Sequence, residues 1–480
     1  MGNLDVKVAG SVLWSVLEKI LSIVVQLLVG IIVARMLLPE DYGLMAILTF
    51  FTSLGIVFSD SGFSQALLRK ASVTAEEIKS VFIFNISASA AIYVLCLCIA
   101  PLLARFYVKD VILQIAPVLF LVIPINALSA VQNVILSREF RFALVSKVNF
   151  VSNLLSGIIS AVMALMGMGV WSLVAQRLVQ SALRTLFLWF YAFRRLEGRF
   201  QKDNLRKLSS FSIPLMLTDL LSSFFSNIAQ LFIGKLYSPH SLGFFNQAQK
   251  IKDLPLTASM QSLQSVTFPA LAQVQNNEEK FSLSICKVLS VTAYVMFPLM
   301  AGMALVAKDM FFVLLGEKWT PSVEYFQILA TFSMAYPIAM ISYNVMKIKM
   351  EGPALLRLEI VKKCIFAIML CFTIPHSVKA VAWAVALMML IEMVINLFFV
   401  CKKSSVRFSN LFYALVHPLW LTAVMALVLL FTSSFFCTLS PLLRLMLEIL
   451  LGAVCYFSIS ILSRCAALDD IVTLIKKLKL

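Results

Sequence analysis

The chain has 480 residues, of which 61% are hydrophobic and only 13% are charged, and its mean hydropathy is +0.94. Soluble proteins carry roughly a quarter charged residues, so this composition excludes a soluble globular protein and indicates a polytopic membrane protein. The net charge of +16 does not indicate nucleic-acid binding, because the Lys and Arg residues lie in short runs between apolar segments, as the positive-inside rule describes.

Apolar segments of about 20 residues, the length that crosses a bilayer, recur along the chain and predict about fourteen spans. The first half holds six, near 11–36, 42–68, 80–107, 111–136, 146–167 and 170–193. The second half holds six more, near 211–236, 242–272, 282–306, 323–348, 354–375 and 378–401, and two further spans follow near 410–433 and 441–463. We expect the limits of spans four, eight and ten to differ most from these values.

The two halves repeat each other. The segment ARMLLPEDYGL at 34–44 reappears as GKLYSPHSLGF at 234–244, with the basic residue, the proline and the glycine in the same places. Asn133 is echoed by Asn344 and Trp171 by Trp383, so the offset drifts from 200 to 212 along the repeat. Six spans in each half make the repeats parallel, a construction typical of carriers that rock around a central site.

The sequence therefore predicts an all-α membrane protein with two pseudo-symmetric six-helix lobes and two extra C-terminal helices. The lobes are 1–193 and 211–403, joined by a basic linker at 194–210 and followed by the extra helices at 404–464 and a tail at 465–480. Basic residues gather on one side of the predicted membrane, most densely in the linker and the tail. This asymmetry predicts that both termini are cytoplasmic.

Polar residues recur at helical spacing inside several spans, where they are costly unless they face a cavity or a partner. The stripes in spans one, seven and eight are expected to meet across the pseudo-two-fold axis and to line a polar cavity. The cavity candidates in these spans are Gln26, Gln230, Asn246, Lys250 and Lys252. Span two adds Thr49, Ser53, Asp60 and Ser64 on one stripe. The alternative is that such Ser and Thr stripes only pack helices closely.

Arg177 and Arg184 lie two turns apart on one face of span six, with Ser181 between them. Two guanidinium groups on one face suit an anionic substrate, because guanidinium binds phosphate through two hydrogen bonds. A structural pairing of each arginine with a nearby Asp or Glu is the alternative. Glu359, Lys362, Lys363 and Glu392 are interpreted as interfacial charges near the cytoplasmic ends of their spans.

Four acids inside spans are candidates for binding a coupling proton or sodium ion: Glu18, Asp60, Asp219 and Asp253. Glu18 and Asp219 occupy near-equivalent places in the two halves. Either acid could instead pair with a neighbouring cation such as Lys19.

The sequence shows no pattern that indicates catalysis. The nine cysteines lie in or beside apolar spans without metal-ligand spacing to the three histidines, so we interpret them as buried thiols and expect no metal site, no cofactor and no catalytic residues.

The segments ARMLLPEDYGLMAI and FSDSGFSQALLRK in the first half, with SLGFFNQAQKIKDLP and VTFPALAQVQNNEEKF in the second, resemble the signatures of a known family. This is the polysaccharide transporter (Wzx-type) family of bacterial lipid-linked oligosaccharide flippases, in its colanic acid exporter-like branch. It belongs to the multidrug/oligosaccharidyl-lipid/polysaccharide exporter superfamily. The resemblance covers most of the chain and is weak in the last two spans.

This resemblance implies a flippase that moves undecaprenyl-pyrophosphate-linked polysaccharide repeat units across the bacterial inner membrane by alternating access, coupled to a proton or sodium ion. Its expected partners are the lipid-linked oligosaccharide, membrane lipids, the coupling ion, and a polysaccharide polymerase with other assembly proteins; nucleic acid is not among them. In related lipid II flippases, the two extra helices hold the lipid tail. The alternatives are a multidrug or lipid II exporter of the same superfamily, or a membrane polysaccharide polymerase, which is an enzyme.

Overall fold

The computed structural model describes residues 21–471 apart from 61, 71, 193–197, 274–276, 405, 437 and 464. In these residues the regular structure consists of helices, without strands, which confirms the predicted all-α class. The chain forms two compact units, Met1–Asn246 and Gln247–Leu480.

The first unit contains the helix Leu21–Met36 and a series of longer helices. These are α2 (Pro39–Asp60), α3 (Phe63–Arg69), α4 (Ala75–Tyr107), α5 (Val111–Phe120), α6 (Val122–Arg138), α7 (Phe142–Leu165), α8 (Val170–Tyr191), α9 (Lys202–Leu236) and the first turns of α10 (Pro239–Gln273). The second unit contains the rest of α10 and the helices that follow it. These are α11 (Glu278–Leu305), α12 (Ala307–Leu315), the 3-10 turn η1 (Glu317–Trp319), α13 (Pro321–Ser333), α14 (Ala335–Lys349), α15 (Gly352–Thr373), α16 (Val378–Lys403), α17 (Phe408–Ser433) and α18 (Pro441–Leu462).

Ten helical segments of the described chain are long and apolar enough to cross a membrane, counting α5 with α6 and α13 with α14 as one segment each. The helix Leu21–Met36 coincides with the end of predicted span one. The long helices α8, α10 and α15 coincide with predicted spans six, eight and eleven. Spans six and eight carry the arginines and lysines predicted to bind substrate: Arg177, Arg184, Lys250 and Lys252.

Two predicted spans are broken by proline at matching places in the two repeats. Span four divides at Leu121 into α5 and α6, because Pro124 has no N–H to donate to the carbonyl of Phe120. Span ten divides at Met334 into α13 and α14, where Pro337 leaves the carbonyl of Ser333 without its helical donor in the same way.

Span two is shorter than predicted. α2 ends at Asp60, and Gly62 has a φ of +72°, a left-handed conformation that glycine adopts without strain. A side chain at this position would also meet the backbone carbonyl of Ser212. The predicted end of the span, 63–68, is therefore a separate helix, α3.

The repeated motif contacts its own copy. A methyl group at Gly43 would overlap the backbone carbonyl of Pro239, and a methyl group at Gly243 would overlap the backbone carbonyl of Pro39. All four residues belong to the first unit. The two Pro-Gly motifs thus pack reciprocally, through the small residues that allow close backbone approach in membrane proteins.

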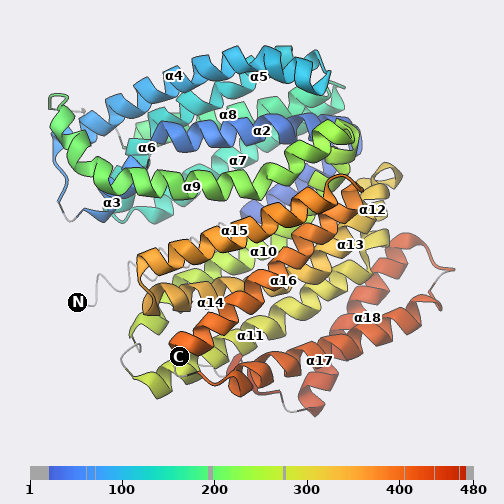
Figure 1. The fold of residues 1–480 in the computed structure, drawn as a ribbon. Helices are drawn as coiled ribbons and strands as arrows, with labels where there is room; N and C mark the ends of the chain where they lie inside the picture. The colour runs from blue at the N-terminus through green and yellow to red at the C-terminus, as the bar shows by residue number, and fades with distance from the viewer. Residues whose placement is uncertain are drawn as a thin grey trace. The chain divides into compact units, whose positions relative to one another are not determined.

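In the first unit α2 lies between α4 and α9 and packs on both, while α6 packs on α4 and α8 (Figure 1). α9 opens the second repeat of the sequence, and yet it packs on α2, α3 and α4 of the first repeat. Tyr107 on α4 donates a hydrogen bond to the carbonyl of Leu231 on α9, at 3.3 Å. The first unit therefore includes the helix that begins the second copy.

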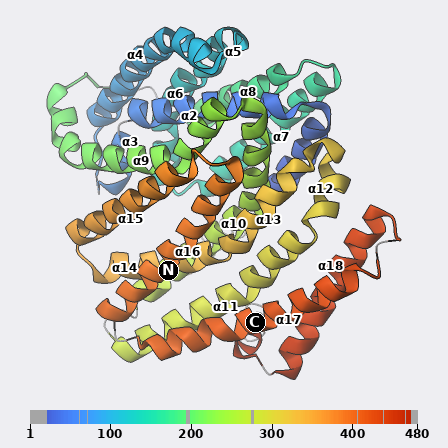
Figure 2. The same cartoon turned by 45° about the vertical axis from the view of Figure 1, so that its right-hand side comes forward.

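In the second unit the C-terminal helices α17 and α18 form a hairpin along α11 and α12 (Figure 2). At one end, Arg444 on α18 forms a two-point ion pair with the buried Asp309 on α12. Further along α18, Tyr456 donates to the carbonyl of Tyr294 and Ser460 donates to its hydroxyl, both at 2.8 Å. Specific polar contacts thus attach the two extra helices to the unit.

We expect Gly43→Ala and Gly243→Ala each to destabilise the protein. Because the obstructing atoms are backbone, each added methyl should cost at least the 1–3 kcal/mol typical of overpacking, roughly. Thermal unfolding of the purified protein in lipid nanodiscs measures this. Gly30→Ala is the control, because a methyl group there meets nothing within 4 Å. Equal melting temperatures for all three variants would contradict the reciprocal contact.

Candidate functional site

A polar cavity of about 250 Å³ opens in the first unit between α2, α5, α6 and α8. α2 contributes Thr49, Thr52 and Ser53, which follow at helical spacing and so face one direction. α8 contributes Arg177, Gln180, Ser181 and Arg184, again on one face. Asn126 of α6 and the apolar side chains Ile56, Leu119 and Val122 complete the lining.

The two arginines predicted from the sequence are both in this wall. Arg177 is exposed to the cavity and Arg184 is partly buried. Arg184 donates a hydrogen bond from Nε to Oδ1 of Asn149 on α7, at 2.9 Å. Its hydrogen-bond partner is thus a neutral amide rather than an acid.

Among the described residues, the lining contains two guanidinium groups and no carboxylate. Ser181 is 6% exposed, and among the described residues its hydroxyl has no hydrogen-bond partner, an unusual state for a buried polar group. Nδ2 of Asn126 donates to the carbonyl of Val122 at 2.9 Å, so the side-chain oxygen of Asn126 takes no part in that bond. Positive charge together with an unused hydroxyl indicates that the cavity suits an anionic group with several acceptor oxygens.

Two of the acids proposed for ion coupling lie close together in the first unit. Asp60, at the end of α2, accepts hydrogen bonds from Ser64 and from Nδ2 of Asn85, the latter at 3.1 Å. Asp219 on α9 accepts from Nε2 of Gln65 at 3.1 Å and acts electrostatically on Asp60. Neighbouring residues of the short helix α3 therefore connect the two carboxylates.

Asn85, which donates to Asp60, is fully buried. Its Nδ2 donates to Asp60, while its side-chain oxygen has no hydrogen-bond partner in the part of the chain that the structure describes. An acceptor oxygen without a partner beside a pair of carboxylates is suited to a cation or to a protonated carboxyl group.

The remaining candidates lie elsewhere. Gln26 is exposed on the helix Leu21–Met36, and Gln230 and Asn246 are partly buried in α9 and α10. Glu18 lies outside the described residues. In the second unit, Lys250 is exposed, while Lys252 is 4% exposed and forms an ion pair with Asp253 at 3.0 Å. The charges of Lys252 and Asp253, predicted to serve different roles, are thus already matched to each other.

Several polar residues that line the cavity or contact its arginines were not predicted from the sequence. Gln180 shares the face of Arg177 and could have been found from helical spacing alone. Asn126 and Asn149 lie on other helices, so only the tertiary fold brings them to the arginines. Lys362, expected at an interface, is instead 2% exposed and contacts Glu359 and Oδ1 of Asn396, the latter at 3.3 Å.

The cavity carries no arrangement that indicates a metal or a cofactor. Across the described residues, no three His, Cys, Asp or Glu side chains lie close enough to hold a metal ion. What the lining offers is charge and hydrogen bonding, which bind and orient a ligand.

Sequence comparison gives the relationship of the chain to known proteins. Residues 32–324 match the family model described as polysaccharide biosynthesis protein. The chain is 25% identical over 411 residues to an uncharacterized membrane protein from the cps region of Klebsiella pneumoniae, covering 83% of each chain. It is 25% identical over 308 residues to a succinoglycan biosynthesis transport protein of Rhizobium meliloti, covering 64% of this chain and 62% of that one.

Comparison with solved structures gives the fold. The structure of a lipid II flippase, MurJ in an inward closed conformation, superposes with a TM-score of 0.77 over 94% of this chain and 99% of that one. The sequences are 15% identical. The likeness includes the two helices that follow the duplicated halves, because almost the whole of both chains is covered.

Proposed function

Because the chain belongs to the polysaccharide biosynthesis protein family, we propose that it is a flippase for lipid-linked polysaccharide repeat units in the bacterial inner membrane. The substrate in this proposal is an undecaprenyl pyrophosphate that carries a short glycan. The observation that carries the proposal is the polar cavity of the first unit, which has two guanidinium groups and no acid in its lining. The relative that is named as a succinoglycan transport protein supports the same class of substrate.

The chemistry of the head group matches the cavity. Pyrophosphate offers several anionic oxygens, which Arg177 and Arg184 can bind as charge-assisted hydrogen bonds, and the unpartnered Ser181 hydroxyl can donate a further one. A volume of about 250 Å³ accommodates the phosphates but not a whole repeat unit. The glycan of the repeat unit is therefore proposed to lie outside this cavity.

Lys250 is proposed as a further substrate-binding cation. It is exposed on α10, in the repeat that follows the second Pro-Gly motif. As a compact cation it is proposed to attract an anionic substrate. Gln26, Gln230 and Asn246 are proposed as hydrogen-bonding contacts for the sugar hydroxyls.

A multidrug exporter of the same superfamily is the nearest alternative. A cavity for cationic drugs needs carboxylates in its wall, and the lining of this cavity has none. A lipid II exporter shares the fold and the pyrophosphate, so it differs only in the glycan. A polysaccharide polymerase would need catalytic groups at the substrate, whereas the lining holds only groups that bind it.

Asp60 and Asp219 are the proposed coupling acids. Two neighbouring carboxylates repel each other, and binding of one proton or sodium ion between them would relieve that repulsion. They link α2 of the first repeat to α9 of the second through α3, so their occupancy could bias how these helices pack. Glu18 and Asp253 are kept as further candidates for the same role.

We expect Arg177→Gln, Arg184→Gln and Lys250→Gln each to abolish or strongly reduce glycan export, since each removes a positive charge proposed to attract the anionic substrate. The cation exchanges Arg177→Lys and Lys250→Arg should retain part of the activity. Export in a strain that lacks the gene, with protein abundance measured in parallel, tests this. Normal export by all three Gln variants would contradict the cationic site, and a loss of abundance would assign the residues to folding.

We expect Asp60→Asn and Asp219→Asn to lose the stimulation of flipping by an imposed proton or sodium gradient while still binding substrate. Flipping of a lipid-linked glycan in proteoliposomes measures both properties. The control is Asp203→Asn, an exposed acid in the first turn of α9. Unchanged stimulation in both variants would contradict the role of these two acids and would indicate that another acid binds the coupling ion.

The proposed orientation has both termini in the cytoplasm, because the Lys and Arg residues of 194–210 and 465–480 concentrate on one side. A topology reporter fused at residue 200 should therefore report the cytoplasm. A periplasmic reporter at this position would contradict both the orientation and the assignment of six spans to the first half.

A further inference from the structure

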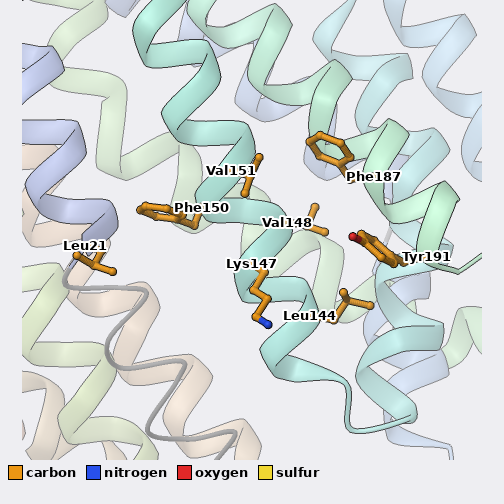
Figure 3. A pocket seen from close by; sticks show the side chains of 8 residues that line it. All are labelled: Leu21, Leu144, Lys147, Val148, Phe150, Val151, Phe187 and Tyr191. Carbon is orange, nitrogen blue, oxygen red and sulfur yellow. The ribbon is translucent and has the colours of Figure 1, made fainter.

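Outside the polar cavity, the first unit holds a second pocket, of about 360 Å³, against α7 and α8 (Figure 3). Its walls include the apolar side chains of Val148, Val151 and Phe187, and it shares no residue with the polar cavity. We assign this pocket no ligand. The second unit holds a different feature that the proposed transport does not use, a buried cluster of charged side chains.

This charged cluster lies at the contact between α12 and α18. Arg444, near the start of α18, forms its two-point ion pair with Asp309 in the first turn of α12. Glu448 follows Arg444 by one turn of α18, on the inward face that also carries Leu445 and Gly452. Asp309 and Glu448 are each only 6% exposed. Two carboxylates and one guanidinium group thus share a buried site.

The charges of the cluster do not balance. Arg444 donates to Asp309 through both Nε and Nη2. The first turn of a helix favours negative charge, so Asp309 is stabilised as a carboxylate twice over. Glu448 acts electrostatically on both neighbours, but among the described residues its carboxylate has no hydrogen bond and no ion pair. The unmatched negative charge of the cluster therefore falls on Glu448.

The other helices that pack on α18 do not supply a counter-charge for Glu448 within the described part of the chain. From α17, the neighbour one turn beyond Glu448 is the apolar Leu429, and the titratable His417 lies three turns before Leu429. From α11, the titratable group is Tyr294, which contacts α18 about two turns beyond Glu448. On α12, Lys308 precedes Asp309 and is exposed.

The depth of Glu448 in the membrane makes its charge costly. Glu448 lies seven residues after Pro441, the first residue of α18, which places it roughly 10 Å inside the span. An ionised carboxylate is unfavourable at such a depth unless it is paired. The Arg444 side chain is 19% exposed and lies closer to the end of the span. The cluster is therefore near enough to water to exchange a proton.

We propose that Glu448 is a proton-binding site, which carries its proton at neutral pH and keeps the contact between α12 and α18 electrically neutral. The proton comes from the aqueous phase and bonds to a carboxylate oxygen of Glu448. A metal cation is disfavoured here, because the adjacent guanidinium of Arg444 repels it. This site lies in the second unit and is distinct from the pair of Asp60 and Asp219 proposed for coupling.

The proton also affects how the C-terminal hairpin is attached. When Glu448 loses its proton, the cluster carries a net negative charge, and the ionised Glu448 competes with Asp309 for Arg444. The ion pair between Arg444 and Asp309 is the polar contact that joins α18 to α12 at this end of the hairpin. The hairpin of α17 and α18 is therefore attached more firmly while Glu448 is protonated.

Infrared spectroscopy of the full-length protein in a detergent without ester groups tests the proposal, because a protonated carboxyl group has a C=O stretching band that a carboxylate lacks. A solvent-exposed Glu, with a pKa of about 4.3, is ionised at neutral pH and contributes no such band. The wild-type protein should show a band at neutral pH that is lost in Glu448→Gln. Asp309→Asn should lose the same band, because Arg444 then pairs with an ionised Glu448.

Thermal unfolding provides the second measurement. Raising the pH from neutral to alkaline should lower the melting temperature of the wild-type protein more than that of Glu448→Gln, because Gln has the shape of the protonated acid and cannot ionise. The matched control is Glu279→Gln, which removes an exposed acid in the first turn of α11 in the same unit. This control should match the wild type in its infrared band and in its response to pH.

Identical carboxyl bands in the wild-type and Glu448→Gln spectra would overturn the proton-binding site. Persistence of the Glu448 band in Asp309→Asn would overturn the arrangement in which Asp309 holds Arg444 away from Glu448. Equal responses of the wild-type and Glu448→Gln melting temperatures to pH would overturn the link to the hairpin. None of these readouts depends on glycan export, so their failure is distinguishable from a failure of the proposed function.

Discussion

The reciprocal contact between the two Pro-Gly motifs is the constraint on which the first unit depends. Gly43 meets the carbonyl of Pro239 and Gly243 meets the carbonyl of Pro39, so each copy of the motif fixes the other. Backbone atoms on both sides leave no side chain that could adjust, and the start of α10 is therefore held against the start of α2. The two copies of the motif thus contact each other symmetrically, as expected of repeats related by an axis along the membrane normal.

The polar cavity and the carboxylate pair of the first unit both include residues of α2, the helix that begins at the Pro-Gly contact. Its middle turns face the polar cavity through Thr49, Thr52 and Ser53, and its last residue, Asp60, joins the carboxylate pair with Asp219. One rigid helix thus connects the Pro-Gly contact, the proposed head-group site and the proposed coupling acids. In the proposed mechanism, a change in the charge of the carboxylate pair acts on the helix that also lines the polar cavity, and so links ion binding to substrate binding.

Much of the fold followed from the sequence, because hydropathy and the duplication depend on local composition. The all-α class was predicted correctly, and the breaks at Pro124 and Pro337 fall in two of the three spans whose limits were expected to differ. Helical spacing also found Arg177 and Arg184 as neighbours on one face. It could not find Asn126, Asn149 or the link from Asp60 through α3 to Asp219, since these join helices that are far apart in sequence. The burial of Lys362 was missed for the same reason.

The most direct test of the account is binding of ligands to the purified protein in nanodiscs, measured by titration calorimetry at two salt concentrations. An undecaprenyl pyrophosphate that carries sugars should bind, more weakly at high salt, and the uncharged polyprenol with the same sugars should bind far less. Arg177→Gln with Arg184→Gln should reduce both the affinity and its dependence on salt. Equal binding of the charged and uncharged lipids, or binding of cationic drugs in preference to both, would contradict the claim that the cavity recognises a pyrophosphate head group.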